Sequence, residues 1–75
     1  MKKKLYYTVE KELRDIDGVE ETTGIKTITA YSVVDGEIKK QFDVECDNED
    51  NSKDVIDDYL IDNGMDESEF ELILL

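Results

Sequence analysis

The stretch from residue 25 to residue 46 contains an Asp-Gly pair, Asp35-Gly36, between two runs rich in β-branched and aromatic residues. This pattern predicts a two-residue type I′ hairpin turn, because both central residues of that turn need a positive φ. The turn also predicts the strand register, since it places Val34 opposite Glu37 and every further pair follows from that one. No other feature of the sequence constrains the fold as strongly.

The predicted register sorts the hairpin into a mostly apolar face and a mostly polar face, as expected for two strands that are covered on one side only. The pairs on the expected inner face are Val33–Ile38, Tyr31–Lys40, Thr29–Phe42, Thr27–Val44 and Ile25–Cys46. The pairs on the expected outer face are Ser32–Lys39, Ala30–Gln41, Ile28–Asp43 and Lys26–Glu45.

The segment before this hairpin predicts a first strand over residues 4–13, where apolar and polar side chains alternate and Leu5 and Tyr7 point inward. Residues 15–24 are polar and contain two glycines, so we expect a loop or a wide hairpin connection there. Within it, Ile16 and Val19 are expected to fold back over the open end of the core.

The segment after the hairpin predicts a helix that begins at an N-cap on Asn51 or Ser52 and ends before Gly64. Its apolar side chains recur with helical spacing and form one face, made of Val55, Ile56, Tyr59 and Leu60. Residues 70–75 then alternate again and predict a last strand.

These elements predict an α+β fold in the order βββαβ, an antiparallel meander with one helix packed on one face of a four-stranded sheet. We expect the last strand beside the first and parallel to it, where Glu71 would lie near the basic residues 2–4. A chain of 75 residues has room for one small core, so residues 1–75 are expected to form a single domain.

The net charge of −12 is unevenly distributed along the chain. Residues 43–75 contain thirteen acidic side chains and a single basic one, Lys53, whereas residues 1–14 have a net positive charge. An acidic surface of this kind repels nucleic acids and anionic membranes and attracts basic partners. We therefore expect no direct nucleic-acid binding and no membrane binding.

Side chains that commonly carry catalysis are scarce. The sequence has no histidine, and its one cysteine, Cys46, has no neighbouring base to activate it. We therefore expect neither an enzyme nor a bound cofactor or metal. The basic N-terminus is followed by an alternating pattern rather than an apolar run, and a single cysteine fits a reducing compartment, so we expect a cytoplasmic protein.

A calcium site is the alternative for residues 43–54, where acidic or amide side chains occupy several positions of an EF-hand-like loop. Asn48 stands where that loop needs glycine, and Asp54 stands where it needs a bidentate glutamate. A solvated acidic turn followed by a helix cap is the favoured interpretation. The Asp15-x-Asp17-Gly18 fragment is likewise typical of an Asx turn.

Two hypotheses of function follow. In the first, the chain is an acidic protein-interaction module, and closely spaced carboxylates imitate a nucleic acid and bind a basic protein surface. Small acidic inhibitors from phages and mobile elements are similar in size and composition. The candidate residues are Asp47, Glu49, Asp50, Asp54, Asp57, Asp58 and Asp62.

In the second hypothesis, the chain is an assembly subunit that homodimerises through its uncovered sheet face. The candidate residues are Tyr6, Ile28, Val34, Ile73 and Leu75.

Overall fold

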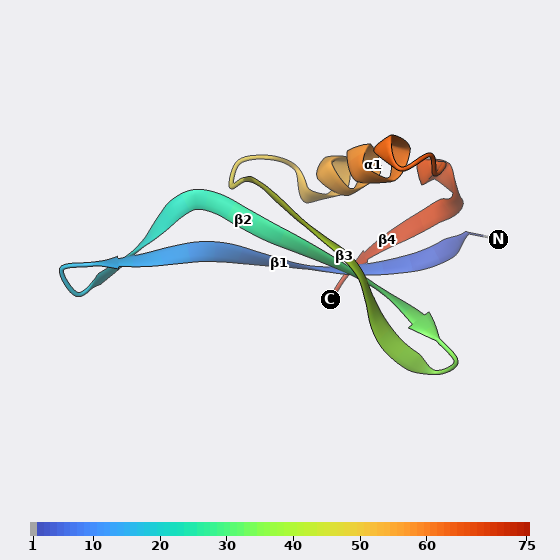
Figure 1. The fold of residues 1–75 in the computed structure, drawn as a ribbon, viewed down its shortest axis with the longest axis horizontal. Helices are drawn as coiled ribbons and strands as arrows, with labels where there is room; N and C mark the ends of the chain where they lie inside the picture. The colour runs from blue at the N-terminus through green and yellow to red at the C-terminus, as the bar shows by residue number, and fades with distance from the viewer. Residues whose placement is uncertain (1) are drawn as a thin grey trace.

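The computed structural model describes residues 2–75, and it contains one sheet with a helix on one of its faces (Figure 1). The elements in chain order are β1 (Lys3–Ile16), β2 (Val19–Val34), β3 (Glu37–Asp47), α1 (Ser52–Asp62), the 3₁₀ turn η1 (Glu67–Glu69) and β4 (Phe70–Leu74). The strands lie in the order β3-β2-β1-β4. The predicted α+β class is confirmed.

The sheet is mixed rather than purely antiparallel. β1, β2 and β3 form an antiparallel meander, whereas β4 pairs with β1 in parallel. The last strand therefore lies beside the first, as expected, and Glu71 is the register partner of Lys4. This order leaves β3 and β4 as the two edges of the sheet.

The Asp35-Gly36 turn forms as predicted, with φ values of 53° and 80°. The predicted register holds for the first four pairs, from Val34–Glu37 to Tyr31–Lys40. It then shifts by one residue, because Ala30 pairs with Phe42 instead of Gln41. A β-bulge at Gln41 thus places one extra residue in β3, and it changes the face of every pair farther from the turn.

The predicted faces are therefore wrong for the residues of β2 beyond the bulge. They are right for Phe42 and Val44 of β3. Ile28 and Ala30 have no exposed surface and lie under α1, on the same side as Phe42 and Val44. The buried core consists of Leu5, Tyr7, Ile28, Ala30, Ile56 and Leu60. Lys26 also moves to this side, where it is 6% exposed and pairs with Cys46 rather than Glu45.

The prediction of a loop or a wide hairpin connection over residues 15–24 is only partly right. The segment joins the two strands as a hairpin, but β1 and β2 continue to a second, tight two-residue turn at Asp17-Gly18. The φ values of 52° and 79° at these residues match those of the other turn. Ile16 and Val19 are exposed on the strands and do not cover the core. The strands have no third neighbour between residues 13 and 22, and we call this two-stranded segment the β1–β2 arm.

The arm makes the molecule elongated, as Figure 1 shows. The Cα radius of gyration is 14.3 Å, whereas a compact domain of this length has a radius of about 11 Å. β2 bends where the arm joins the sheet, near Gly24, whose positive φ of 87° accompanies an irregularity in the β1–β2 pairing. The arm leaves the helix-covered part of the sheet as a separate region.

Helix α1 begins and ends as predicted. The Asn51 side chain accepts a 3.0 Å hydrogen bond from the backbone of Lys53, and Gly64 follows the helix with a positive φ. Ile56 and Leu60 are buried against the sheet. Four aspartates lie on or near the other faces of this helix, so its stability depends on packing rather than on helix propensity.

Candidate functional site

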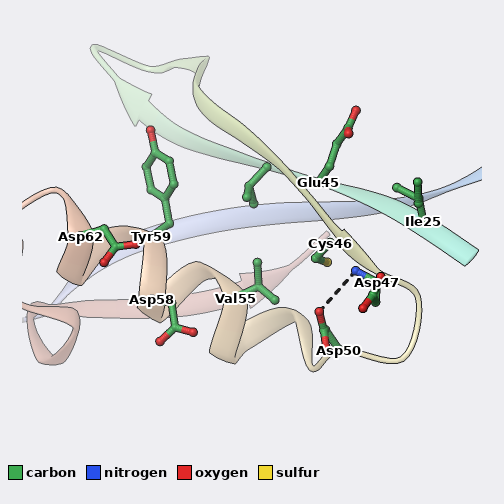
Figure 2. A pocket seen from close by; sticks show the side chains of 10 residues that line it. Ile25, Glu45, Cys46, Asp47, Asp50, Val55, Asp58, Tyr59 and Asp62 are labelled. Atoms are coloured by element: carbon green, nitrogen blue, oxygen red, sulfur yellow. Dashed lines mark hydrogen bonds between the residues drawn. The ribbon is translucent and has the colours of Figure 1, made fainter.

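An open groove of about 520 Å³ lies between edge strand β3 and helix α1 (Figure 2). Its apolar lining consists of Ile25, Val44, Cys46, Val55 and Tyr59. Its carboxylates are those of Glu45, Asp47, Asp50, Asp58 and Asp62. Within residues 2–75, no basic side chain lines this groove. We call it the β3–α1 groove.

The groove exists because α1 packs over the centre of the sheet and not over its β3 edge. The buried helix residues Ile56 and Leu60 belong to the same core cluster as Ile28 and Ala30 of β2. Val55 and Tyr59 are only half-buried beside β3. The Tyr59 ring stacks on Phe42 of β3 with a centroid separation of 4.0 Å and an interplanar angle of 17°. This stack ties the helix to the edge strand at one place.

The turn at residues 47–50 is held by hydrogen bonds at the other end of β3. The backbone N–H of Asp50 donates to the carbonyl of Asp47 at 3.0 Å, and the N–H of Asp47 donates to Asp50 Oδ2 at 3.3 Å. The N–H of Asn48 donates to the carbonyl of Gly24 at 2.8 Å. The buried Lys26 ammonium also donates to the carbonyl of Asp50. These bonds position two groove carboxylates.

The predicted partner-binding acidic residues divide into two sets. Asp47, Asp50, Asp58 and Asp62 all line the β3–α1 groove. The other three, Glu49, Asp54 and Asp57, do not line it. Asp57 is half-buried, and burial, together with the negative charges of Glu67, Asp54 and Asp58, raises the pKa of its carboxyl above the ordinary value.

Two features of the groove were not predicted from the sequence. Glu45 is predicted to pair with Lys26, but the register shift leaves it opposite Thr27, where it borders the groove while its side chain points away from α1 (Figure 2). The sequence also does not predict the apolar lining of the groove, because its pattern assigns Val44 and Cys46 to the inner face of the sheet. A signal was present, since alternating apolar residues on a strand that ends a meander need not be fully covered.

Cys46 lies in the apolar part of the groove and is half-buried. Burial raises the pKa of its thiol, and the nearby charges of Asp50 and Asp47 raise it further, whereas Lys26 lowers it. A thiol with a raised pKa is a poor nucleophile at neutral pH. This environment therefore gives Cys46 the character of a small apolar side chain.

The acidic segment from Asp43 to Asp54 is distributed over a strand, a turn and a helix. Asp43 and Glu45 lie on β3. The Asp43 carboxylate forms an ion pair with Lys40, with 2.6 Å between Oδ2 and Nζ. Asp54 lies in the first turn of α1. Within residues 2–75, no three His, Cys, Asp or Glu side chains are grouped as metal ligands.

The predicted dimer-face residues are also separated. Tyr6 and Ile73 are register partners and half-buried on the uncovered sheet face, where Tyr31 is the next residue across. Ile28 does not belong to this face, because it is fully buried beneath α1. The remaining two predicted residues, Val34 and Leu75, are exposed at strand ends.

Comparison of the chain with protein-family models, with curated proteins and with solved structures found no match. Within residues 2–75, no helix has the length and apolar character needed to span a membrane.

Proposed function

We propose that this protein is a non-enzymatic interaction module that binds a basic protein surface through the carboxylates of the β3–α1 groove. The observation that carries the proposal is the composition of the groove, where four aspartates border an apolar lining, Glu45 lies on the far side of β3, and no basic side chain among the described residues lines the groove. Uncompensated charges of one sign attract a partner of the opposite sign and increase its rate of association.

A nucleic-acid-like charge array is the finer form of this proposal. Asp54, Asp58 and Asp62 follow one another at intervals of four residues on α1, so they form a row with a spacing of about 6 Å along the helix axis. Such a row of negative charges on a rigid element can occupy the groove of a nucleic-acid-binding protein. In this form, the module displaces duplex DNA from a basic protein that binds DNA without sequence preference.

The test is fluorescence anisotropy with a labelled lysine-rich peptide at increasing salt concentration. We expect affinity to fall at least roughly tenfold between about 50 and about 300 mM salt, because exposed charge interactions are screened. The double variant Asp58→Asn/Asp62→Asn should weaken binding about twofold to thirtyfold at low salt, since exposed ion pairs contribute roughly 0.2–1 kcal/mol each.

The matched control is Glu20→Gln/Glu21→Gln, which removes the same charge from the β1–β2 arm, where both side chains are exposed. This variant should bind within about twofold of the unmodified protein, because neither Glu20 nor Glu21 lines the groove. Equal losses in the two double variants would show that only the total charge matters. Affinity that does not depend on salt would contradict the proposal itself.

A second candidate function is homodimer assembly through the uncovered sheet face. The observation that favours it is a row of large side chains across three strands, formed by Ile73, Tyr6 and Tyr31. Light scattering at high concentration measures the molar mass directly. We expect Ile73→Lys to break a dimer and Ile61→Lys, at an exposed position of α1, to leave it intact. A monomer at all concentrations rejects this candidate.

A further inference from the structure

Strand β3 is an open edge of the sheet. Its only strand neighbour is β2, and in an antiparallel pair the backbone groups of alternate residues point away from the neighbouring strand. Within residues 2–75, Asp47 is the only residue of β3 with a backbone hydrogen bond to a group outside the sheet. Unpaired N–H and C=O groups along an edge are a template for another extended chain.

The available edge is limited to the part of β3 beside the groove. The bulge at Gln41 interrupts the regular strand at one end, and the hydrogen-bonded turn at residues 47–50 ends it at the other. Residues 42–46 remain between them, because the backbone groups of Asp47 are bonded to Asp50. This length accommodates an extended segment of about five residues.

The two sides of this edge differ in chemistry. On the helix side, a bound segment would meet Val44, Val55 and Tyr59, with Asp58 and Asp62 at the border. On the other side it would meet Glu45, which points away from α1 in Figure 2. It would also meet Asp43, whose carboxylate forms an ion pair with Lys40. A strand has alternating side chains, so its inward residues would be apolar and its outward residues basic.

We propose that an extended segment of a partner protein, with Val or Ile alternating with Lys or Arg, adds to β3 along residues 42–46 as a fifth strand. This inference rests on the proposed function and names the partner as a strand instead of a folded basic surface. A second copy of β3 paired over the same residues is less suitable, because it can place Asp43 opposite Glu45, and like charges in cross-strand positions are unfavourable.

The test uses labelled octapeptides and the unmodified protein. The first peptide alternates Val and Lys, and the second has the same composition as repeated Lys-Lys-Val-Val. Two further versions of the alternating peptide have N-methyl groups on alternate residues, in complementary positions. Only one of these two sets of N–H groups can face β3, so each N-methylated peptide is the control of the other.

We expect the alternating peptide to bind at least about tenfold more tightly than its isomer. One N-methylated peptide should lose roughly tenfold or more in affinity, because the backbone hydrogen bonds donated to β3 are lost. The other should bind within about twofold of the unmethylated peptide. Binding should also slow amide hydrogen exchange at alternate residues within 42–46.

The outcomes separate this inference from the proposed function. If all four peptides bind equally and weaken with salt, the strand addition is wrong and the acidic interaction module stands. If the amides protected on binding are those of β4, the assigned edge is wrong. If no peptide binds at low salt, both proposals fail.

Discussion

Replacing Ile28 by alanine tests the face assignment that the β-bulge creates. Ile28 has no exposed surface and belongs to the core cluster under α1. The replacement removes three buried carbon atoms, which at about 0.8 kcal/mol each amounts to roughly 2.4 kcal/mol of transfer free energy. The cavity left behind adds to this, so we expect a total loss of about 3–4 kcal/mol.

This loss is large for a small domain. The expected free energy of unfolding for 75 residues is about 4–11 kcal/mol, so Ile28→Ala removes a third or more of it. Since 1 kcal/mol corresponds to about 4–8 °C in a domain of this size, the melting temperature should fall by more than about 12 °C. Urea denaturation followed by far-UV circular dichroism measures the change in the free energy of unfolding.

The matched control is Ile38→Ala, which removes the same atoms from a side chain that is 65% exposed near the Asp35-Gly36 turn. Its cost should not exceed about 1 kcal/mol, the range of strand propensity. If Ile38→Ala costs more than Ile28→Ala, then Ile28 is not under the helix and the shifted register is wrong.

Two further predictions concern titratable groups. The raised pKa of Asp57 means that its ionised form destabilises the folded state at neutral pH, and this cost disappears as pH falls through the folded-state pKa. Asp57→Asn should therefore stabilise the protein by about 0.3–0.5 kcal/mol at neutral pH and by less in acid. Urea denaturation at both pH values measures this difference, and equal effects at the two pH values would contradict the prediction. For Cys46, the pH midpoint of alkylation by iodoacetamide should lie above that of a free thiol, because burial raises its pKa. Lys26→Met should move this midpoint higher still, and a downward shift would refute the role of the Lys26 charge.

Local chemistry predicted the turn and the helix ends well. Asp35-Gly36 adopts the positive φ values that its type requires, and Asn51 and Gly64 act at the two ends of α1. In each case the signal and the structure involve the same few residues, so no tertiary information is needed. The α+β class followed from these elements and their order.

The face of β2 could not be predicted in the same way. A single extra residue at Gln41 shifts the pairing of β2 with β3 by one residue, so every β2 residue beyond it shares a face with different β3 residues. Nothing in the residues around Gln41 distinguishes a bulge from a regular strand. The burial of Ile28 under α1 is a tertiary effect that selects the bulged register. The composition of the groove depends on the same shift, so it was predictable only in part.

The second turn was missed for a different reason. Asp17-Gly18 has the same sequence as Asp35-Gly36 and lies between Ile16 and Val19, but the neighbouring residues are too polar to indicate strands. The segment forms strands even though it buries no apolar face. The alternation of apolar and polar residues arises because one face of a strand is buried. It therefore does not detect strands that are exposed on both sides.

The β1–β2 arm is also the part of this chain where we expect changes of sequence to be tolerated best. Residues 13–22 pair only with one another, and an isolated two-stranded ribbon is marginally stable in water. The arm can consequently open, be cleaved or accept inserted residues while the helix-covered sheet stays folded. Leu13 and Val19, which are 55% and 58% exposed, contribute nothing to the interior, so a substitution there leaves the remainder of the domain intact.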